Sequence, residues 1–312
     1  MAALLLGCEP EQFERVTEDL SQRLSDQIIQ CNPGDASKPC IAIVSHSTLD
    51  VKYLDLAKDV HQRYARKFGY DYILRNNLLT EQFIDRFASS KVFQLGLYWQ
   101  KIFAVQAAFE ERDARSHDPE KRRYGWVMWV DADALFTNFT IPLEEITAKH
   151  PGKSFLVSRE PYMKINAGIF LLKNDPWSRE MLATVARSYA YYRNHNQPEQ
   201  EALQDYIFGF IGKDGRGELS YTPVEQKYYD PSLVAKEAII LPQRHLTAFY
   251  PGSGMITLFA YGEDVVWEPG DFIEHFAIAD QKHKAIKALT DCFKEKGGDS
   301  YENNQTAIQE CR

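Results

Sequence analysis

Short apolar runs alternate with amphipathic segments along most of the chain, and this pattern predicts an α/β fold. Residues 40–44 are apolar and β-branched and lead into polar residues, which is typical of a buried strand. From residue 51 to 68 apolar side chains recur at helical spacing, and Gly69 follows as a C-terminal cap. Residues 70–74 predict a second strand. A strand, a helix and a strand of these lengths form a right-handed crossover, so we expect a parallel sheet.

A continuously apolar and aromatic segment at residues 124–130 predicts a central strand of this sheet, covered on both faces. The segment ends at Asp131 and Asp133, which places two carboxylates at the C-terminal end of a strand. Ligands of open α/β sheets bind at this edge. The same pattern predicts further strands at residues 154–158, 168–172, 238–241 and 272–276, and helices at about 93–109, 177–193 and 198–208.

The regular pattern covers the middle of the chain and weakens toward both ends, which predicts the domain boundaries. Residues 1–39 form an N-terminal extension with one amphipathic helix that stops at Asn32-Pro33-Gly34. Residues 40–292 form the globular domain, and residues 293–312 form a flexible polar tail. A chain of 312 residues with 44% hydrophobic residues has enough apolar material for one large core.

Composition narrows the classes of function. The chain has 36 Lys and Arg against 44 Asp and Glu, a net charge of −8, which opposes binding to nucleic acids or anionic lipids. No apolar stretch approaches the ~20 residues of a membrane-spanning helix, so we expect no transmembrane segment in this chain. The five cysteines lack C-x-x-C spacing, which excludes a zinc ribbon. Cys31 and Cys40 could form a disulfide or stay reduced, so the compartment stays open, as does the oligomeric state.

Asp131-Ala132-Asp133 carries the candidate chemistry. A triplet of this kind is common by chance, but here it follows directly after a predicted buried strand. Two carboxylates displayed there can bind a divalent cation together with two phosphate oxygens. The alternative is a solvated pair in a surface loop.

Five other motifs accompany this one in order along residues 40–275. They are Tyr98-Trp99-Gln100-Lys101, residues 165–170 with Asn166-Ala167-Gly168, residues 199–203, Pro242-Gln243-Arg244 and residues 270–276. Together the six motifs resemble those of GT-A glycosyltransferases, particularly the galactosyl, mannosyl and xylosyltransferase family 34. The resemblance implies a GT-A fold, an α/β architecture in which a Rossmann-like, mostly parallel sheet has flanking helices and a C-terminal acceptor-side subregion.

The resemblance also implies a function and a set of site residues. The function is metal-dependent, retaining transfer of a hexose or pentose from UDP-galactose, UDP-xylose or GDP-mannose to a hydroxyl of an oligosaccharide or glycoconjugate. Mixed carboxylate and imidazole ligation favours Mn²⁺ over Mg²⁺. The implied metal ligands are Asp131, Asp133 and His275, and the implied catalytic residues are Gln200 and Glu201. The implied donor-binding residues are Ser45, Lys101, Asp131, Asn166, Ala167, Gly168, Glu199 and Lys282.

The sequence departs from the family at two places. Ser45 and its neighbours stand where the family usually has a glycine near the base-binding loop, and Ile278 stands where another glycine is usual. Gln281, Lys282 and Lys284 are candidate substitutes for a basic residue of the family after this second position.

Alternatives remain open for mechanism, residue roles and function class. In a front-face reaction Gln200 would lie beside the anomeric carbon, whereas double displacement would recruit Glu199, Glu201 or Asp205. Lys101 and Gln200 have ordinary helix-surface positions as their structural alternatives. The competing classes are an inactive nucleotide-sugar or glycan-binding module and a dehalogenase-type phosphotransferase, whose motif usually has Thr or Val where this chain has Leu135.

The resemblance favours the Golgi lumen, whereas the lack of a signal or anchor in this chain favours a soluble cytoplasmic form.

Overall fold

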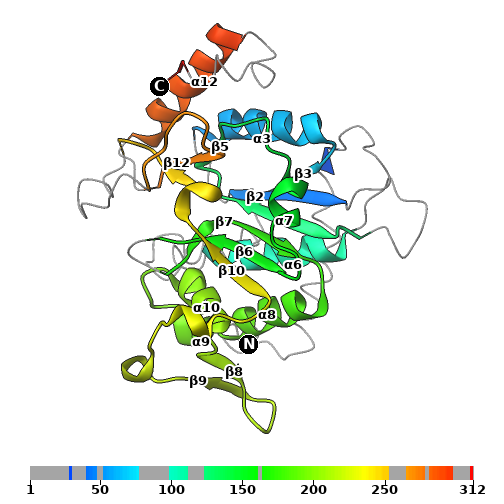
Figure 1. Ribbon diagram of the computed structural model, residues 1–312, viewed down its shortest axis with the longest axis vertical. Helices are drawn as coiled ribbons and strands as arrows, with labels where there is room; N and C mark the ends of the chain where they lie inside the picture. Colours follow the sequence, from blue (N-terminus) through cyan, green and yellow to red (C-terminus); the bar gives the residue numbers. More distant parts are fainter. Residues whose placement is uncertain are drawn as a thin grey trace.

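A seven-stranded sheet lies at the centre of the molecule, with helices on both faces (Figure 1). The computed structural model describes residues 28–29, 40–47, 52–76, 98–111, 123–160, 164–252, 265–277, 281–297 and 310–311. Across the sheet the order is β1 (Ile28–Ile29), β3 (Asp71–Asn76), β2 (Ile41–Ser47), β4 (Trp126–Val130), β7 (Asn166–Lys173), β6 (Phe155–Ser158) and β10 (Ala238–Leu241).

Most of the strands in this sheet run in the same direction. β2 is parallel to β3 and β4, and β6 is parallel to β10. β7 is antiparallel to both of its neighbours, and β1 is antiparallel to β3. The predicted mostly parallel sheet is therefore confirmed, although the central strand β4 has a parallel neighbour on one side only.

Alternating side chains of each central strand enter two separate cores. Ile41 and Ile43 of β2 belong to one buried cluster, and Ala42 and Val44 belong to the other. The first core contains side chains of α3 (Leu54–Phe68), α7 (Leu143–Ala148) and α12 (Lys282–Gly297). The second contains side chains of α6 (Gln100–Glu110), α8 (Pro176–Arg187), α9 (Tyr189–Tyr192) and α10 (Pro198–Ile207). Burial on both faces explains why these strands are continuously apolar.

A small second sheet joins distant parts of the chain. Its order is β11 (Ala248–Phe249), β12 (Ile273–His275) and β5 (Ala134–Phe136). β5 follows β4 after a short turn and pairs with β12 in antiparallel register, with Ala134 opposite His275. This register brings His275, which is far from β4 in the sequence, close to the end of β4.

The remaining elements lie on the side of α8, α9 and α10 or connect the strands. β8 (Ile211–Lys213) and β9 (Leu219–Tyr221) form a hairpin at the lower end of Figure 1. Short 3-10 helices follow in this described stretch, namely η3 (Val224–Gln226), η4 (Pro231–Leu233) and η5 (Gln243–His245). No helix of the described ranges combines the length and apolar character needed to cross a membrane.

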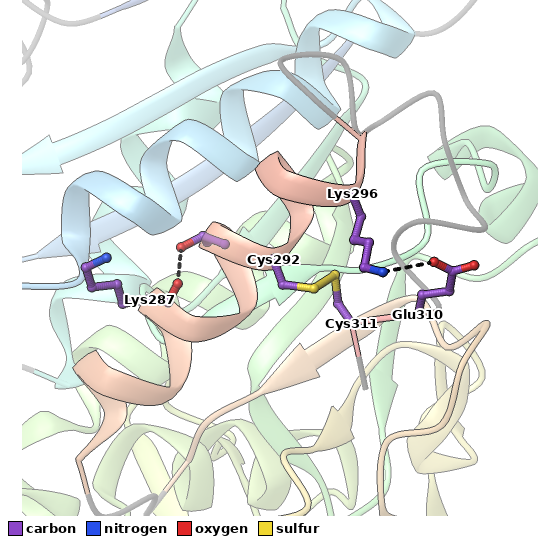
Figure 2. Close-up of a disulfide and its surroundings, with 6 residues drawn as sticks. Lys287, Cys292, Lys296, Glu310 and Cys311 are labelled. Atoms are coloured by element: carbon purple, nitrogen blue, oxygen red, sulfur yellow. Dashed lines mark hydrogen bonds and ion pairs between the residues drawn. A yellow bond between two sulfur atoms is a disulfide. The ribbon is translucent and has the colours of Figure 1, made fainter.

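The last helix corrects the predicted C-terminal boundary. α12 runs across residue 292 to Gly297, because Ile286, Leu289 and Phe293 are buried in the first core. Figure 2 shows that a disulfide joins Cys292 of this helix to Cys311. The predicted flexible tail at 293–312 is therefore wrong for its helical start and for its tethered residue Cys311.

Most predicted elements occur where the hydrophobic pattern places them. Gly69 ends α3 with a φ of 74°, and its N–H contacts the carbonyls of Ala65 and Arg66, as expected of a cap. The predicted helix at 177–193 is divided at Ser188, which separates α8 from α9. Most of the predicted N-terminal helix and Cys31 lie outside the described residues, but its last residues, Ile28–Ile29, form a strand.

Candidate metal centre and donor site

Asp131 and Asp133 lie at the C-terminal end of β4, as the sequence predicts. The backbone N–H of Asp131 donates to the carbonyl of Gly168 at 2.8 Å, which continues the pairing of β4 with β7. The N–H of Ala134 then donates to the carbonyl of Asp131 at 3.1 Å. This turn redirects the chain into β5 and displays both carboxylates on one side.

His275 meets the carboxylates through the pairing of β5 with β12. The N–H of Phe276 donates to the carbonyl of Asp133 at 2.8 Å, and Nε2 of His275 lies 3.4 Å from Oδ1 of Asp133. One ligand atom from each of Asp131, Asp133 and His275 lies within 4.8 Å of the others. The structure therefore brings the three predicted metal ligands together.

The chemistry of this cluster suits a divalent cation. Two carboxylate oxygens and one imidazole nitrogen are a ligand set that Mn²⁺ accepts readily. Nδ1 of His275 is buried and has no hydrogen-bond partner within the described part of the chain. Burial alone would raise the pKa of the Asp133 carboxyl, but His275 and Lys282 outweigh it and hold that pKa below its ordinary value. The residues present thus fit the predicted metal, and both its binding and its identity stay predictions.

Gly168 has no room for a side chain. A Cβ at this position would lie 2.5 Å from Cε1 of His275, 2.9 Å from Oδ1 of Asn166 and 3.1 Å from Oδ2 of Asp131. All three separations are shorter than ordinary van der Waals contacts. The glycine therefore lets the first residues of β7 pack directly against the candidate metal ligands.

Lys282 reaches the cluster from the first turn of α12. Its ammonium group forms an ion pair with Asp133, and its side chain is 30% exposed. The predicted basic residue is thus present beside the carboxylates. Its contact with a donor phosphate stays a prediction.

Lys101 is buried under the site, so its alternative role on a solvated helix face is wrong. Nζ lies 3.0 Å from Oε1 of Glu199 and 3.4 Å from Oδ1 of Asp131, and it donates to the carbonyl of Ala167 at 3.0 Å. Burial would lower the pKa of the ammonium group, but the charges of Asp131 and Glu199 outweigh it and raise that pKa. Lys101 therefore balances the charge of two carboxylates of the protein itself, and Glu199 is the nearer of these two counterions.

Gln200 is also buried, so an ordinary helix-surface position is wrong for it as well. Its Oε1 accepts a hydrogen bond from the N–H of Ala167 at 2.8 Å, and its Nε2 lies 3.5 Å from Oε2 of Glu160. Asn166 bends back along the same strand, where its Oδ1 accepts from the N–H of Gly168 at 2.9 Å. Gln200 thus joins the start of α10 to the Asn-Ala-Gly segment.

Three candidate residues have their functional groups engaged elsewhere. Ser45 is 1% exposed and its hydroxyl donates to the carbonyl of Val130 at 2.7 Å, so its side chain does not face a ligand. Glu201 points toward His195, whose Nδ1 lies 2.8 Å from its Oε2. Asp205 is fully buried and is contacted through hydrogen bonds by Tyr192, Lys227 and Tyr229.

Two residues near the site were missed by sequence reasoning. Glu160 follows β6, is 8% exposed, and lies beside the amide groups of Asn166 and Gln200. Tyr53 precedes α3, and burial together with the charges of Asp133 and Asp131 raises the pKa of its phenol. Glu160 had one available signal, because it lies just beyond a predicted strand at the ligand-binding edge. Tyr53 had none.

Comparisons with known proteins agree with this geometry. The chain is 32% identical over 157 residues to putative glycosyltransferase 7 of Arabidopsis thaliana, covering 46% of this chain and 30% of the relative. It is 30% identical over 125 residues to galactomannan galactosyltransferase 1 of Cyamopsis tetragonoloba, covering 38% of this chain and 24% of that protein. It is 34% identical over 95 residues to xyloglucan 6-xylosyltransferase 4 of Arabidopsis thaliana, covering 28% and 17%. The chain is a relative of glycosyltransferases.

The structural comparison concerns the fold. A glycosyltransferase involved in the glycosylation of the major capsid of PBCV-1 aligns with a TM-score of 0.53 and 16% identity, covering 80% of this chain and 99% of that chain. The α/β fold class of the resemblance is therefore confirmed. No protein-family model matches the chain. The chain spans less than a third of the length of the curated relatives described above, with 30%, 24% and 17% covered.

Proposed function

We propose that the protein is a metal-dependent, retaining glycosyltransferase that moves a hexose or pentose from a nucleotide sugar to a glycan hydroxyl. The observation that carries the proposal is the meeting of Asp131, Asp133 and His275 beside the Asn-Ala-Gly start of β7. The relatives named as galactosyl- and xylosyltransferases support UDP-galactose and UDP-xylose as the first donors to test.

Asp131, Asp133 and His275 would hold the cation. When bound, it would supply positive charge against the diphosphate that leaves the donor sugar. The residues of the chain prepare this arrangement. Lys101 forms an ion pair with the Asp131 carboxylate, and the indole Nε1 of Trp129 donates to Oδ1 of Asp131 at 2.6 Å.

Lys282 provides a second positive charge on the other side of the carboxylates. Its long side chain is partly exposed, so it can leave Asp133 and reach a phosphate oxygen without unfolding of α12. We propose that Lys282 exchanges one anionic partner for the other when the donor binds.

Retention of configuration has two possible routes, and the contacts of the carboxylates favour the front-face route. Double displacement needs a carboxylate that can bond to the anomeric carbon. Glu199 pairs with Lys101, Glu201 with His195, and Asp205 is surrounded by three donors. In a front-face reaction the leaving phosphate itself accepts the proton of the acceptor hydroxyl, so no such carboxylate is required.

The test is hydrolysis and transfer across a panel of UDP and GDP sugars with Mn²⁺, followed by proton NMR of the first product anomer. We expect turnover of at least one donor with retained α configuration. Asp133→Asn should lower turnover at least ~100-fold because one ligand charge is lost, whereas the exposed Asp55→Asn should not. Turnover of no donor, or Asp133→Asn activity above about a tenth of wild type, would refute the proposal.

A further inference from the structure

Glu160 lies where two amide side chains of the site meet. Its Oε2 accepts a hydrogen bond from Nδ2 of Asn166 at 3.2 Å and a longer one from Nε2 of Gln200 at 3.5 Å. The residue is 8% exposed, although it follows the end of β6 in a connecting segment. A buried carboxylate needs donors, and these two amides supply them.

The other end of each amide contacts the backbone of β7. Oδ1 of Asn166 accepts from the N–H of Gly168 at 2.9 Å, and Oε1 of Gln200 accepts from the N–H of Ala167 at 2.8 Å. Each amide therefore spans from the carboxylate to a backbone N–H. The three side chains and the backbone of residues 166–168 form one hydrogen-bonded unit.

The chemistry of the groups allows only one orientation of each amide. An ionised carboxylate only accepts hydrogen bonds, and a backbone N–H only donates. A flipped amide would place its oxygen against Glu160 and its NH₂ group against a backbone N–H, so both contacts would be repulsive. Glu160 thus selects the orientation in which both amide oxygens face β7.

This orientation matters because the same backbone packs against the metal ligands. The space beside Gly168 is too small for a methyl group, because His275, Asn166 and Asp131 lie too close to its backbone. A small shift of residues 166–168 would therefore move both the Asn-Ala-Gly segment and its contacts with the metal centre. Among the acidic residues near α10, Glu160 is the one whose described hydrogen bonds go to the two amides.

We propose that Glu160 is a positioning residue that fixes the amides of Gln200 and Asn166 and, through them, the backbone against which the donor sugar lies. The inference rests on the proposed function for its effect on turnover. It does not rest on that function for its effect on the amides, which the protein alone can report.

The first experiment measures turnover in a double-mutant cycle. Glu160→Ala should lower kcat by roughly 10- to 100-fold with a much smaller change in the donor KM. Glu160→Gln keeps one acceptor oxygen and the side-chain volume, so it should recover part of the loss. The double variant Glu160→Ala with Gln200→Ala should lose clearly less than the product of the two single losses, because part of the effect of Glu160 passes through Gln200 and the rest through Asn166. The exposed Glu145→Gln is the matched control and should behave as wild type.

Losses that multiply in the double variant, or an unchanged kcat in Glu160→Ala, would overturn the inference. Thermal unfolding of each variant identifies a protein that has failed to fold, and the cycle is then run with Glu160→Gln. Under the same criterion, a Glu160→Gln loss that multiplies with that of Gln200→Ala overturns the inference.

The second experiment needs no donor. The side-chain NH₂ resonances of Asn166 and Gln200 in ¹H–¹⁵N NMR spectra should shift in Glu160→Gln and stay in place in Glu145→Gln. Unshifted resonances would overturn the inference even if the wild type is active. If the wild type turns over no donor but Glu160→Gln shows these shifts, the proposed function is overturned and the positioning role stays supported.

Discussion

Substitution of Gly168 by alanine tests whether the close packing of β7 against the metal ligands is functional. The added Cβ would lie 2.5 Å from Cε1 of His275, about 1 Å inside an ordinary contact between carbon atoms of roughly 3.5 Å. It would also lie 2.9 Å from Oδ1 of Asn166 and 3.1 Å from Oδ2 of Asp131. His275 is held by β12 and is buried, so it cannot simply rotate into solvent.

The magnitude follows from this geometry. Overpacking of a buried position costs about 1–3 kcal/mol of unfolding free energy. In a protein of this size the melting temperature should fall by roughly 2–10 °C. Displacement of His275 or Asp131 from the cluster should weaken Mn²⁺ binding by at least ~10-fold, as expected when support of a ligand is lost.

Calorimetric titration with Mn²⁺ and thermal unfolding without metal measure the two effects separately. Gly212→Ala is the matched control, because a Cβ there meets no atom within 4 Å. It should leave both Mn²⁺ affinity and melting temperature nearly unchanged. Gly168→Ala with wild-type Mn²⁺ affinity would refute the assignment of this cluster as the metal centre, and an unchanged melting temperature would refute the packing argument.

Three further predictions concern titratable or charged groups, two of them at the site and one at His61, a buried residue of α3 whose Nε2 lies 2.7 Å from the carbonyl oxygen of Ala134. Lys282→Ala should strengthen Mn²⁺ binding in the absence of nucleotide by up to ~10-fold, because a competitor for Asp133 is removed. The same substitution should weaken UDP binding, because a positive charge near the diphosphate is lost. Separate titrations with Mn²⁺ and with UDP measure the two effects. Burial lowers the pKa of His61 to about 4 from 6.5, so stability is full above pH 6.5 and falls by up to about 3 kcal/mol as the pH drops toward 4. Urea unfolding at pH 7 and pH 4.5 should show a smaller loss in His61→Gln than in wild type. Chelation of divalent cations should lower UDP affinity at least ~10-fold, and equal affinities with and without chelator would contradict the proposed metal role.

The hydrophobic pattern predicted most of the sheet because the central strands are buried on both faces. Such strands are continuously apolar, and residues 124–130 and 168–172 show this directly. The direction of β7 was not predictable in the same way. An apolar run has the same appearance in a parallel and in an antiparallel strand, so pairing with β4 had to come from the structure.

Short elements were missed for a different reason. β5 was not predicted, because its three residues gain their stability from pairing with β12 across a long stretch of sequence and not from a local pattern, whereas β12 lies within the predicted strand at 272–276. α12 was not predicted, and its last residues, 293–297, were assigned to a flexible tail because its exposed face is rich in lysine. Its apolar residues Ile286, Leu289 and Phe293 do have helical spacing, which was the available signal.

For the site, residue identity was more predictable than residue orientation. The strand-end carboxylates and His275 were predicted and lie together. The sequence did not show which way each side chain in the first turn of α10 points, because a one-residue step on a helix turns a side chain by about 100°. Glu199 and Gln200 therefore face the site, while Glu201 faces His195.

The charges of the site explain why a cation and a diphosphate would bind together. Among the described residues, four carboxylates and two ammonium groups lie around the end of β4, namely Asp131, Asp133, Glu160, Glu199, Lys101 and Lys282. With all four carboxyl groups ionised, four negative charges against two positive charges leave a net charge of −2. Such a site repels a diphosphate by itself, and the deficit equals the charge of one divalent cation. Lys101 is buried between its two carboxylates and cannot change partner, so the mobile positive charge is Lys282 alone among these groups. The cation would thus convert a repulsive site into a neutral one, and Lys282, released from Asp133, would add the attraction that holds the diphosphate.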